Sequence, residues 1–231
     1  MFSLGQKLRI AAGSQRNRVR FKRAFDRYCD YSMIPKRNFV HTLEIAQRVA
    51  HLEGCVVECG VWRGGMAAAL ASVLGNRRPY YLLDSFQGMP PATAIDGDRA
   101  IAWEQNVTGP NYFDNCAAPS SHAIEIMTRA QVSDVRLVEG WFCETVPSFK
   151  PAEPIVVLHL DADWYDSIRV CLDHLFDFVT PGGLVIIDDY YVWDGCSRAL
   201  HDFLSSRSAT ERVRTLGSIC YLKKGSRFAH G

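Results

Sequence analysis

The stretch IVVLHLDADWYDSIRVCLDHLFDFVTPGGLVIIDD, residues 155–189, contains the unit from which the fold is predicted. Its two ends, 155–161 and 184–189, are dense in valine, leucine and isoleucine, which is typical of strands buried on both faces. Between them, residues 167–179 place apolar side chains at helical spacing. Two strands joined by such a helix run parallel, because parallel strands need a long crossover. The stretch therefore predicts a strand–helix–strand unit of a parallel sheet.

The same alternation of helix and strand continues through the chain from residue 37. Strands that alternate with helices of this length predict an α/β fold, in which a mainly parallel sheet carries helices on both faces. The helix that begins at Ser120 is expected to be capped by serine. The expected helices are 37–54, 64–76, 120–131, 167–179 and 196–207, and the expected strands are 55–59, 80–84, 135–139, 155–161, 184–189 and 219–224.

Length, charge and cysteine usage limit the classes of function. A chain of 231 residues suffices for one α/β domain with a substantial core. Its net charge of +1 argues against a nucleic-acid partner, because such partners require a strongly positive surface. No apolar run approaches the roughly 18 residues of a membrane span, and no secretion signal is apparent, so we expect a cytoplasmic protein. The eight cysteines show no zinc-ligand spacing and are expected to be reduced structural thiols.

Basic residues are concentrated at the N-terminus. The first 25 residues carry seven lysines and arginines and no acid before Asp26. Such a run is typical of a solvated helical arm, and it also fits steering of an anionic substrate, contact with a membrane surface or a transit peptide. We therefore expect residues 1–36 to form a basic helical arm and residues 37–231 to form the functional domain.

Four acids stand at the ends of expected strands: Glu58, Asp84, Asp161 and Asp188. Ligands of parallel sheets collect beyond the carboxyl ends of the strands, so these acids are expected on one rim, in greater number than packing requires. A long segment rich in proline and glycine, residues 85 to about 119, leaves the same rim. Segments of that length are commonly lids or disordered loops.

The turn after the first expected strand reads VVECGVWRGG, residues 56–65. Its glycines allow a ligand to approach the backbone, and the amides that open the next helix can hold an anionic group. The spacing is E-x-G-x-x-x-G, not the G-x-G-x-x-G of dinucleotide-binding enzymes, which weakens the case for a nicotinamide cofactor. Asp84 stands where an acid accepts hydrogen bonds from two ribose hydroxyls. Together they indicate a nucleoside-containing ligand.

Five motifs, in this order and spacing, resemble the macrocin O-methyltransferase family, which methylates sugar hydroxyls of natural products. The resemblance extends over about residues 30 to 205 and implies a Rossmann-like class I methyltransferase with a mostly parallel seven-stranded sheet. It also implies S-adenosylmethionine as methyl donor, Mg²⁺, a glycoside or sugar acceptor and homo-oligomers, dimeric or larger. The motifs are VVECGVWRGG (56–65), LLDSFQGMP (82–90), VEGWFCETVP (138–147), LHLDADWYDS (158–167) and PGGLVIIDDYYVWDGCSRALHDF (181–203).

The resemblance also assigns roles to individual residues. Asp163 matches the proposed general base, and Asp84 the residue that binds the ribose. Ala162 replaces the usual glycine of the aspartate motif, and ICYLKK at 219–224 replaces a Tyr-Trp pair, which weakens the transfer of substrate contacts to that strand. The implied metal ligands are Asp161, Asp188 and Asp189, and the implied donor site consists of Glu58, Gly60, Gly64, Gly65, Asp84, Ser85, Gly140, Trp141 and Phe142, the last three near the adenine.

The chemistry of the aspartates supports a cation independently of the family. Carboxylates that end two neighbouring strands, about 4.8 Å apart, can reach one octahedral ion. Oxygen ligands suit magnesium, calcium or manganese and not zinc. Asp161 and Asp163 are two positions apart and project to the same side of an extended chain, so one can bind the ion while the other accepts a proton. A sugar hydroxyl needs this help because it is almost wholly protonated near neutral pH.

Other polar and aromatic residues receive structural interpretations or stay open. Asp166 is expected to cap the helix that follows it, His159 to be packed and hydrogen-bonded, and His201 to have no role. We expect residues 31–35, YSMIP, to close over the acceptor together with residues 85–119. Four aromatic residues fit stacking on a sugar ring and packing equally well: Trp103, Tyr190, Tyr191 and Trp193.

Two other functions fit the pattern. A metal-dependent methyltransferase that acts on a phenol or a catechol uses the same ion chemistry, and an aromatic pocket suited to planar substrates would favour it. A non-catalytic donor-binding protein would keep the glycine turn, but it would have no need for the full set of rim acids.

Overall fold

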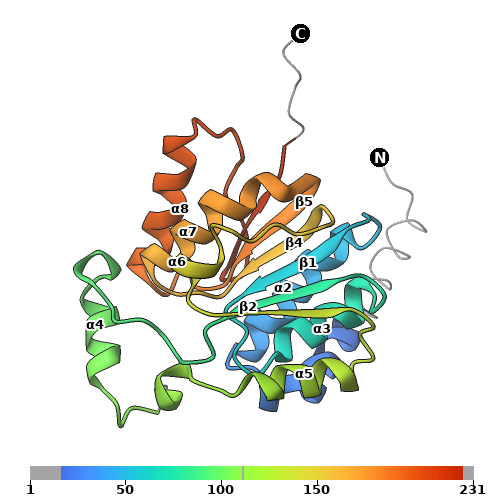
Figure 1. Ribbon diagram of the computed structural model, residues 1–231, viewed down its shortest axis with the longest axis horizontal. Coiled ribbons are helices and arrows are strands. Elements are labelled where there is room, and N and C mark those ends of the chain that lie inside the picture. The colour runs from blue at the N-terminus through green and yellow to red at the C-terminus, as the bar shows by residue number, and fades with distance from the viewer. Residues whose placement is uncertain (1–16, 111, 226–231) are drawn as a thin grey trace, which may run out of the picture.

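Within the residues that the computed structural model describes, 17–110 and 112–225, seven strands form one sheet (Figure 1). The strand order is β3-β2-β1-β4-β5-β7-β6, with β1 to β5 parallel and β7 antiparallel to both neighbours. This confirms the predicted mostly parallel seven-stranded sheet. The strands are β1 (Cys55–Cys59), β2 (Tyr80–Asp84), β3 (Val135–Glu139), β4 (Ile155–Leu160), β5 (Val179–Ile187), β6 (Arg214–Leu216) and β7 (Ile219–Lys223).

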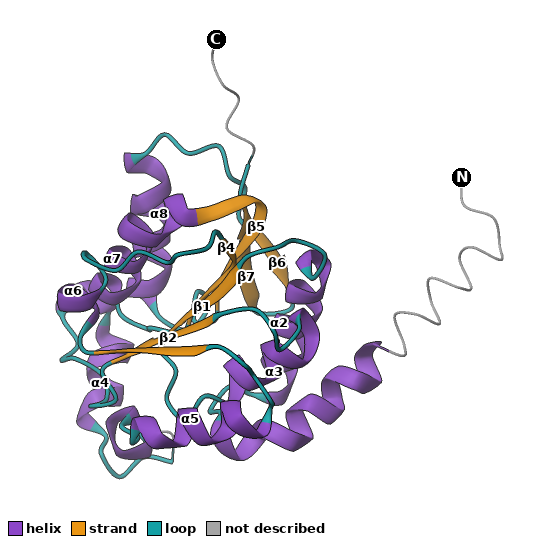
Figure 2. Ribbon diagram, turned by 45° about the vertical axis from the view of Figure 1, so that its right-hand side comes forward, coloured by secondary structure: helices purple, strands orange, loops and turns teal. Residues whose placement is uncertain are grey.

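Helices cover both faces of the sheet, as Figure 2 shows. One face packs against α2, α3 and α5, and the other against α7 and α8, each through its own cluster of buried side chains. The α-helices are α2 (Lys36–Ala46), α3 (Gly65–Leu74), α4 (Asp98–Gln105), α5 (Ser120–Arg129), α6 (Phe142–Thr145), α7 (Tyr165–Leu175) and α8 (Asp194–Ser206). Short 3-10 helices occur at η1 (Cys29–Tyr31), η2 (Gln47–Val49), η3 (Ala94–Asp96), η4 (Phe113–Cys116) and η5 (Phe176–Phe178).

The central strands are apolar throughout because helices cover them on both sides. Every residue of β1 and of β4 is buried. Side chains alternate along a strand, so Val56 joins the cluster on one face of the sheet and Val57 joins the cluster on the other. The dense apolar runs that predicted buried parallel strands are therefore explained by two-sided packing.

Two predicted helix caps are wrong. The residue before α5 is Pro119, and no serine side chain bonds to the start of that helix. Asp166 lies within the first turn of α7 and does not cap it. The backbone N–H of Tyr165 instead donates to the Oδ1 of Asp96, at 2.7 Å, from the segment that follows β2. A carboxylate distant in sequence has taken the place of the local cap.

Two strands, β5 and β6, also differ from the prediction. β5 begins at Val179, five residues earlier than expected, because Val179 pairs with Ile155 before the strand irregularity at 155–157. β6 has only three residues and is largely exposed, so it lacks the apolar run by which the other strands were found.

Residues 17–28, which lie within the predicted arm of 1–36, are helical, and this helix packs against the domain through Phe21, Ala24 and Tyr28. Its remaining surface is solvated, and the basic residues of 1–16 lie outside the described residues. No helix among the described residues is long and apolar enough to cross a membrane. All eight cysteines lie in the described part, and none of them forms a disulfide there.

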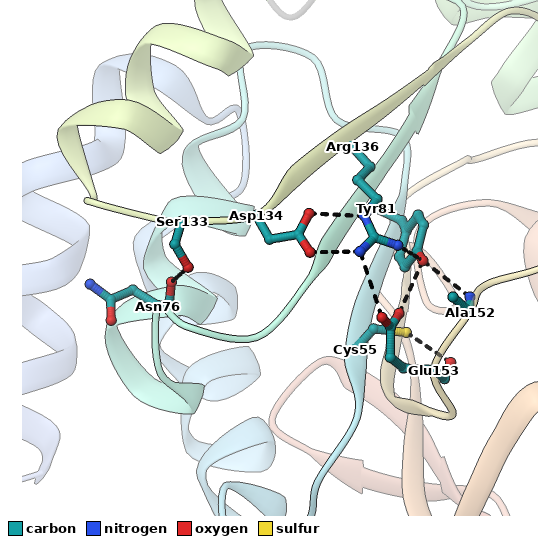
Figure 3. A network of polar contacts seen from close by, with 8 residues as sticks. All are labelled: Cys55, Asn76, Tyr81, Ser133, Asp134, Arg136, Ala152 and Glu153. Atoms are coloured by element: carbon teal, nitrogen blue, oxygen red, sulfur yellow. Dashed lines mark hydrogen bonds and ion pairs between the residues drawn. The ribbon is translucent and has the colours of Figure 1, made fainter.

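A polar network ties the amino-terminal ends of the first four strands together (Figure 3). The Arg136 guanidinium in β3 binds the Asp134 carboxylate, with N–O distances of 2.9 and 2.6 Å, and also donates to the Tyr81 hydroxyl of β2. That hydroxyl donates to Glu153 just before β4, at 3.0 Å, and the carbonyl of Glu153 accepts from the Cys55 thiol of β1. The network lies at the rim opposite the carboxyl ends of the strands.

Candidate active site

Two adjoining cavities among the described residues open at the carboxyl ends of the parallel strands. The first has a volume of about 320 Å³, and the second about 600 Å³. Asp84, Ser85, Trp141 and Phe142 line the first cavity only. The second reaches Glu58 and four aspartates, and its wall includes residues 31–35 and part of α4. Both cavities are lined by Met33, Gly60, Trp62, Met89, Cys116, Asp161 and Asp163.

Asp84, at the end of β2, fixes the glycine turn. Its Oδ2 accepts hydrogen bonds from the backbone N–H groups of Val61 and Trp62, at 2.7 and 2.9 Å, and its Oδ1 accepts from Phe86 at 2.7 Å. Burial raises the pKa of this carboxyl, and the amide hydrogen bonds lower it. Each carboxylate oxygen can accept more than one hydrogen bond, so Asp84 can hold the turn and still face a ligand in the first cavity.

The glycines of the turn have different uses. Gly60 has φ +85°, and a Cβ there would lie 1.8 Å from the carbonyl oxygen of Asp161. Only glycine therefore allows the ends of β1 and β4 to approach. Gly64 packs against Ala123 of α5, and Gly65 against the carbonyl of Tyr31. Gly60 lines both cavities, whereas Gly64 and Gly65 line neither. These glycines are therefore required largely by close contacts between chain segments, and only Gly60 also lines the cavities.

Other predicted donor residues fall into two groups. Trp141 and Phe142, just after β3, line the first cavity, as does Ser85, whose hydroxyl donates to the carbonyl of Gly88 at 3.1 Å. Gly140 lies outside the lining and turns the chain with φ +143°. The structure thus brings Asp84, Ser85, Trp141 and Phe142 together around one cavity.

Glu58 and His159 form a buried pair across β1 and β4. Glu58 Oε1 lies 3.0 Å from His159 Nδ1, and both side chains are almost completely buried. Burial raises the pKa of Glu58, and the contact with His159 opposes this rise. The packed, hydrogen-bonded state predicted for His159 is confirmed. Oε2 of Glu58 is buried without a hydrogen-bond partner, at the wall of the second cavity.

The carboxylates of Asp161, Asp163 and Asp189 lie close together, with one oxygen of each within 4.8 Å of the others. Asp161 follows β4 and Asp189 follows β5, and the two strands are parallel neighbours. Burial raises the pKa of all three carboxyls, and mutual repulsion raises them further. The group differs from the predicted metal set, in which Asp188 takes the place of Asp163.

Asp188 is buried beside this group, and its Oδ1 has no hydrogen-bond partner. Burial raises its pKa, and the charges of Asp189 and Asp163 add to the rise. An unpartnered buried oxygen among crowded carboxylates is a costly arrangement unless positive charge compensates it. Three clustered carboxylate oxygens with a fourth buried carboxylate beside them suit a hard divalent cation, so the residues fit the implied Mg²⁺. The individual metal and base roles remain predictions.

Aromatic residues form one wall of the second cavity. Trp103 of α4 and Trp193 before α8 both line it, whereas Tyr190 and Tyr191 do not. The Tyr190 hydroxyl lies 2.8 Å from Nε2 of His201, at the protein surface. Of the four aromatic residues left open between stacking and packing, the two tryptophans are therefore placed for contact with a ligand.

Sequence reasoning missed two residues that shape the site. The indole N–H of Trp164 donates to the carbonyl of Pro90 at 2.8 Å, and Asp96 joins the start of α7 to Thr93. Trp164 directly follows Asp163 in the motif, and this position next to a predicted catalytic residue could have indicated its place in the site. For Asp96, the signal was the capping-box spacing of Thr93 and Asp96.

A family model described as macrocin-O-methyltransferase (TylF) matches residues 6–224. The chain belongs to this family. The protein is therefore an S-adenosylmethionine-dependent O-methyltransferase with the class I methyltransferase fold. This confirms the resemblance and sets aside a non-catalytic donor-binding protein.

Related proteins and solved structures agree with the family. The 8-demethyl-8-(2,3-dimethoxy-alpha-L-rhamnosyl)-tetracenomycin-C 4'-O-methyltransferase of Streptomyces olivaceus is 34% identical over 181 residues, covering 71% of this chain and 67% of that protein. The mycinamicin III 3''-O-methyltransferase of Micromonospora griseorubida is 33% identical over 184 residues, covering 76% and 70%. The O-methyltransferase NovP shares the fold with a TM-score of 0.67, 24% identity and 81% of each chain covered. The calicheamicin methyltransferase CalS11 has a TM-score of 0.65 at 22% identity, covering 90% of this chain and 93% of that one.

The raised carboxyl pKa values predict a pH-dependent stability of the metal-free protein. A carboxyl whose pKa is higher in the folded than in the unfolded state destabilises the fold as pH rises from about 4 through the raised pKa. We therefore expect Asp189→Asn to stabilise the protein at pH 8 in chelator, by about 1 kcal/mol or more, and so to raise Tm by at least about 2–4 °C. Thermal unfolding should show this gain shrinking toward pH 4.

Glu53→Gln, which removes one charge from the exposed surface, is the matched control and should leave Tm nearly unchanged. A lower Tm for Asp189→Asn at pH 8 would contradict the repulsion among the rim carboxylates.

Proposed function

We propose that this enzyme transfers the methyl group of S-adenosylmethionine to a hydroxyl of a sugar, with Mg²⁺ held by rim aspartates. The observation that carries the proposal is the position of Asp161 and Asp163, which line both cavities at their junction. A donor in the first cavity and an acceptor in the second would meet there. The names of two relatives support a sugar acceptor, since one is a 4'-O-methyltransferase of a rhamnosyl-tetracenomycin and the other a 3''-O-methyltransferase of mycinamicin III.

We assign the first cavity to the methyl donor. Asp84 faces it from the end of β2, where a carboxylate accepts hydrogen bonds from ribose hydroxyls. Trp141 and Phe142 supply apolar surface for the adenine ring. Gly60 lets the donor approach the backbone where the cavities meet. Gly64, Gly65 and Gly140 then act through the shape of the turns, and Glu58 lines the second cavity and not the first.

We assign the acids of the second cavity to the cation and the proton. Asp161, Asp188 and Asp189 would hold Mg²⁺, whose contribution is to stabilise the negative charge that develops on the hydroxyl oxygen. Asp163 accepts the hydroxyl proton. The hydroxyl oxygen forms a bond to the methyl carbon as the carbon–sulfur bond breaks, leaving S-adenosylhomocysteine. Proximity of the two cavities keeps the methyl carbon and the acceptor oxygen aligned.

The dimensions and walls of the second cavity suit a glycoside. About 600 Å³ is within the range of small-molecule sites and is large enough for a sugar with part of its attached group. Trp103 and Trp193 present flat apolar surface, and the aspartates present hydrogen-bond acceptors on another side. A sugar ring has an apolar face and polar edges, so it complements both walls.

We propose that the segment 85–119 acts as a lid over the acceptor. Its described part is folded and contains α4, which contributes Arg99, Ala102 and Trp103 to the second cavity. Backbone N–H of Met89 donates to the carbonyl of Asn115 at 3.0 Å, which joins the two ends of the segment. Met33, from the YSMIP stretch, lines both cavities from the opposite chain segment. The homo-oligomer and the cytoplasmic location remain predictions.

Acceptor choice tests the proposed function directly. Purified enzyme with S-adenosylmethionine and Mg²⁺ should release S-adenosylhomocysteine with simple rhamnosides or a nucleotide-activated deoxyhexose, and chelator should abolish turnover. Because the site is lined by groups that bond to sugar hydroxyls, kcat/KM should exceed that for catechol by at least about 10². Preferential turnover of catechol would overturn the sugar assignment in favour of a phenolic acceptor.

The two roles proposed for the aspartates predict different mutants. Asp161→Asn should weaken both Mg²⁺ binding and turnover, because an amide oxygen is a poorer ligand than a carboxylate, and added Mg²⁺ should partly restore activity. Asp163→Asn should lower kcat by on the order of 10² to 10⁴ while Mg²⁺ and donor binding stay nearly intact. Calorimetry and steady-state kinetics measure both. Near-normal turnover of Asp163→Asn at saturating substrates would refute the base assignment.

Trypsin offers a specific probe of the lid, since Arg99 is the only lysine or arginine in residues 85–119. Its guanidinium donates to the carbonyl of Val192 at 3.1 Å when α4 is docked. We expect cleavage after Arg99 in the free enzyme and several-fold slower cleavage with S-adenosylhomocysteine and a glycoside. Arg99→Gln should lack this cleavage and so identifies the fragment. Equal cleavage rates with and without ligands would count against a lid.

A further inference from the structure

Trp193 makes a direct hydrogen bond to Asp163. Its indole Nε1–H donates to Asp163 Oδ1 at 2.7 Å, from the loop between β5 and α8 to the loop after β4. Asp163 also has φ +55°, a left-handed conformation that a non-glycine residue adopts only when its surroundings hold it there. Both the backbone and one carboxylate oxygen of Asp163 are therefore fixed.

Two further tryptophans hold the indole ring of Trp193 in place. Trp164 packs edge-to-face on Trp193, with ring centroids 5.2 Å apart, and Trp103 of α4 lies 6.3 Å from it. Trp103 and Trp164 also contact each other at 6.0 Å. Edge-to-face contacts of this kind restrict both the position and the tilt of each ring.

Trp103 and Arg99 support the Trp193 ring from the segment proposed as the lid. Trp103 belongs to α4, and the Arg99 guanidinium of the same helix lies over the Trp193 ring, 5.3 Å from its centroid. Arg99 also donates to the carbonyl of Val192, next to Trp193 in sequence. Trp164 in turn is bonded to the carbonyl of Pro90, which precedes α4. The orientation of Trp193 thus depends on how α4 is docked.

We propose that Trp193 is a positioning residue that orients Asp163 for proton acceptance and that α4 maintains this orientation. The inference rests on the proposed function, in which Asp163 is the base. The indole N–H binds Oδ1 and so fixes the plane of the carboxylate, and Oδ2, which carries no bond to Trp193, is the oxygen we assign to receive the proton of the acceptor hydroxyl. A carboxylate held in one rotamer is already oriented toward the hydroxyl, so no side-chain conformational entropy is lost when the proton is transferred. Docking of α4 over the acceptor then aligns the base in the same movement.

Trp193→Phe separates positioning from packing, because phenylalanine keeps an aromatic ring in the cluster and removes the N–H. We expect kcat to fall on the order of 10- to 100-fold, with KM for the sugar and donor affinity changed less than about twofold. Tyr190→Phe is the matched control: it removes one hydrogen bond from the same loop, outside both cavities, and should leave kcat unchanged.

A double-mutant cycle asks whether Trp193 acts through Asp163. In the Asp163→Asn background, where no base remains to be oriented, Trp193→Phe should lower kcat by less than about twofold. Equal fold losses in both backgrounds, or an unchanged kcat in the single mutant, would overturn the inference.

A spectroscopic measurement tests the bond without turnover. In ¹⁵N-tryptophan-labelled protein in chelator, the indole signal that disappears in Trp193→Phe should shift in Asp163→Ala. If no sugar is methylated but this signal shifts, the proposed function fails and the bond stands. If sugars are methylated but the indole signal does not shift in Asp163→Ala, the positioning role fails and the proposed function stands.

Discussion

Repulsion among carboxylates at the carboxyl ends of β4 and β5 is the constraint around which this site is built. The two strands are parallel neighbours, so the acids that follow them emerge side by side. Burial and like charge raise the pKa of Asp161, Asp163, Asp188 and Asp189 together, which means that their ionised forms are costly in the folded protein. A bound divalent cation would relieve this cost. The same arrangement that destabilises the metal-free fold would therefore supply the affinity for such an ion.

The surroundings of the acids resist relaxation. Gly60 brings the end of β1 against the backbone of Asp161, and the Glu58–His159 pair locks β1 to β4 just below. Asp84 holds the glycine turn through backbone amides. The backbone N–H of Asp188 also donates to the carbonyl of Leu160 at 3.0 Å, so the carboxylates that follow β4 and β5 cannot separate without breaking contacts between central strands. Packing thus holds the charged carboxylates in fixed positions, as a preorganised site requires.

The sequence was sufficient for features that depend on local pattern. Apolar runs and helical spacing predicted the central strands and the covering helices, and acids at strand ends predicted the rim, because both follow from periodicity and parallel connection. Contacts between distant segments left no such pattern. Gly65 looked like part of a ligand turn, although it accommodates the carbonyl of Tyr31, and Asp96 replaced Asp166 at the start of α7. The bond from Trp193 to Asp163 likewise depends on a meeting of two loops that spacing alone does not reveal.

The network around Arg136 stands at the rim opposite the acids and joins the ends of β1, β2, β3 and the approach to β4 (Figure 3). In contrast, α4 buries only Ala100 among its described residues, and that residue belongs to neither of the two core clusters. The residues that hold the strands together are therefore different from the residues of α4 that line the second cavity. If the second cavity binds the acceptor as proposed, mutations in α4 would alter its wall while the sheet keeps its stability, and substrate range could then diverge among descendants of one scaffold.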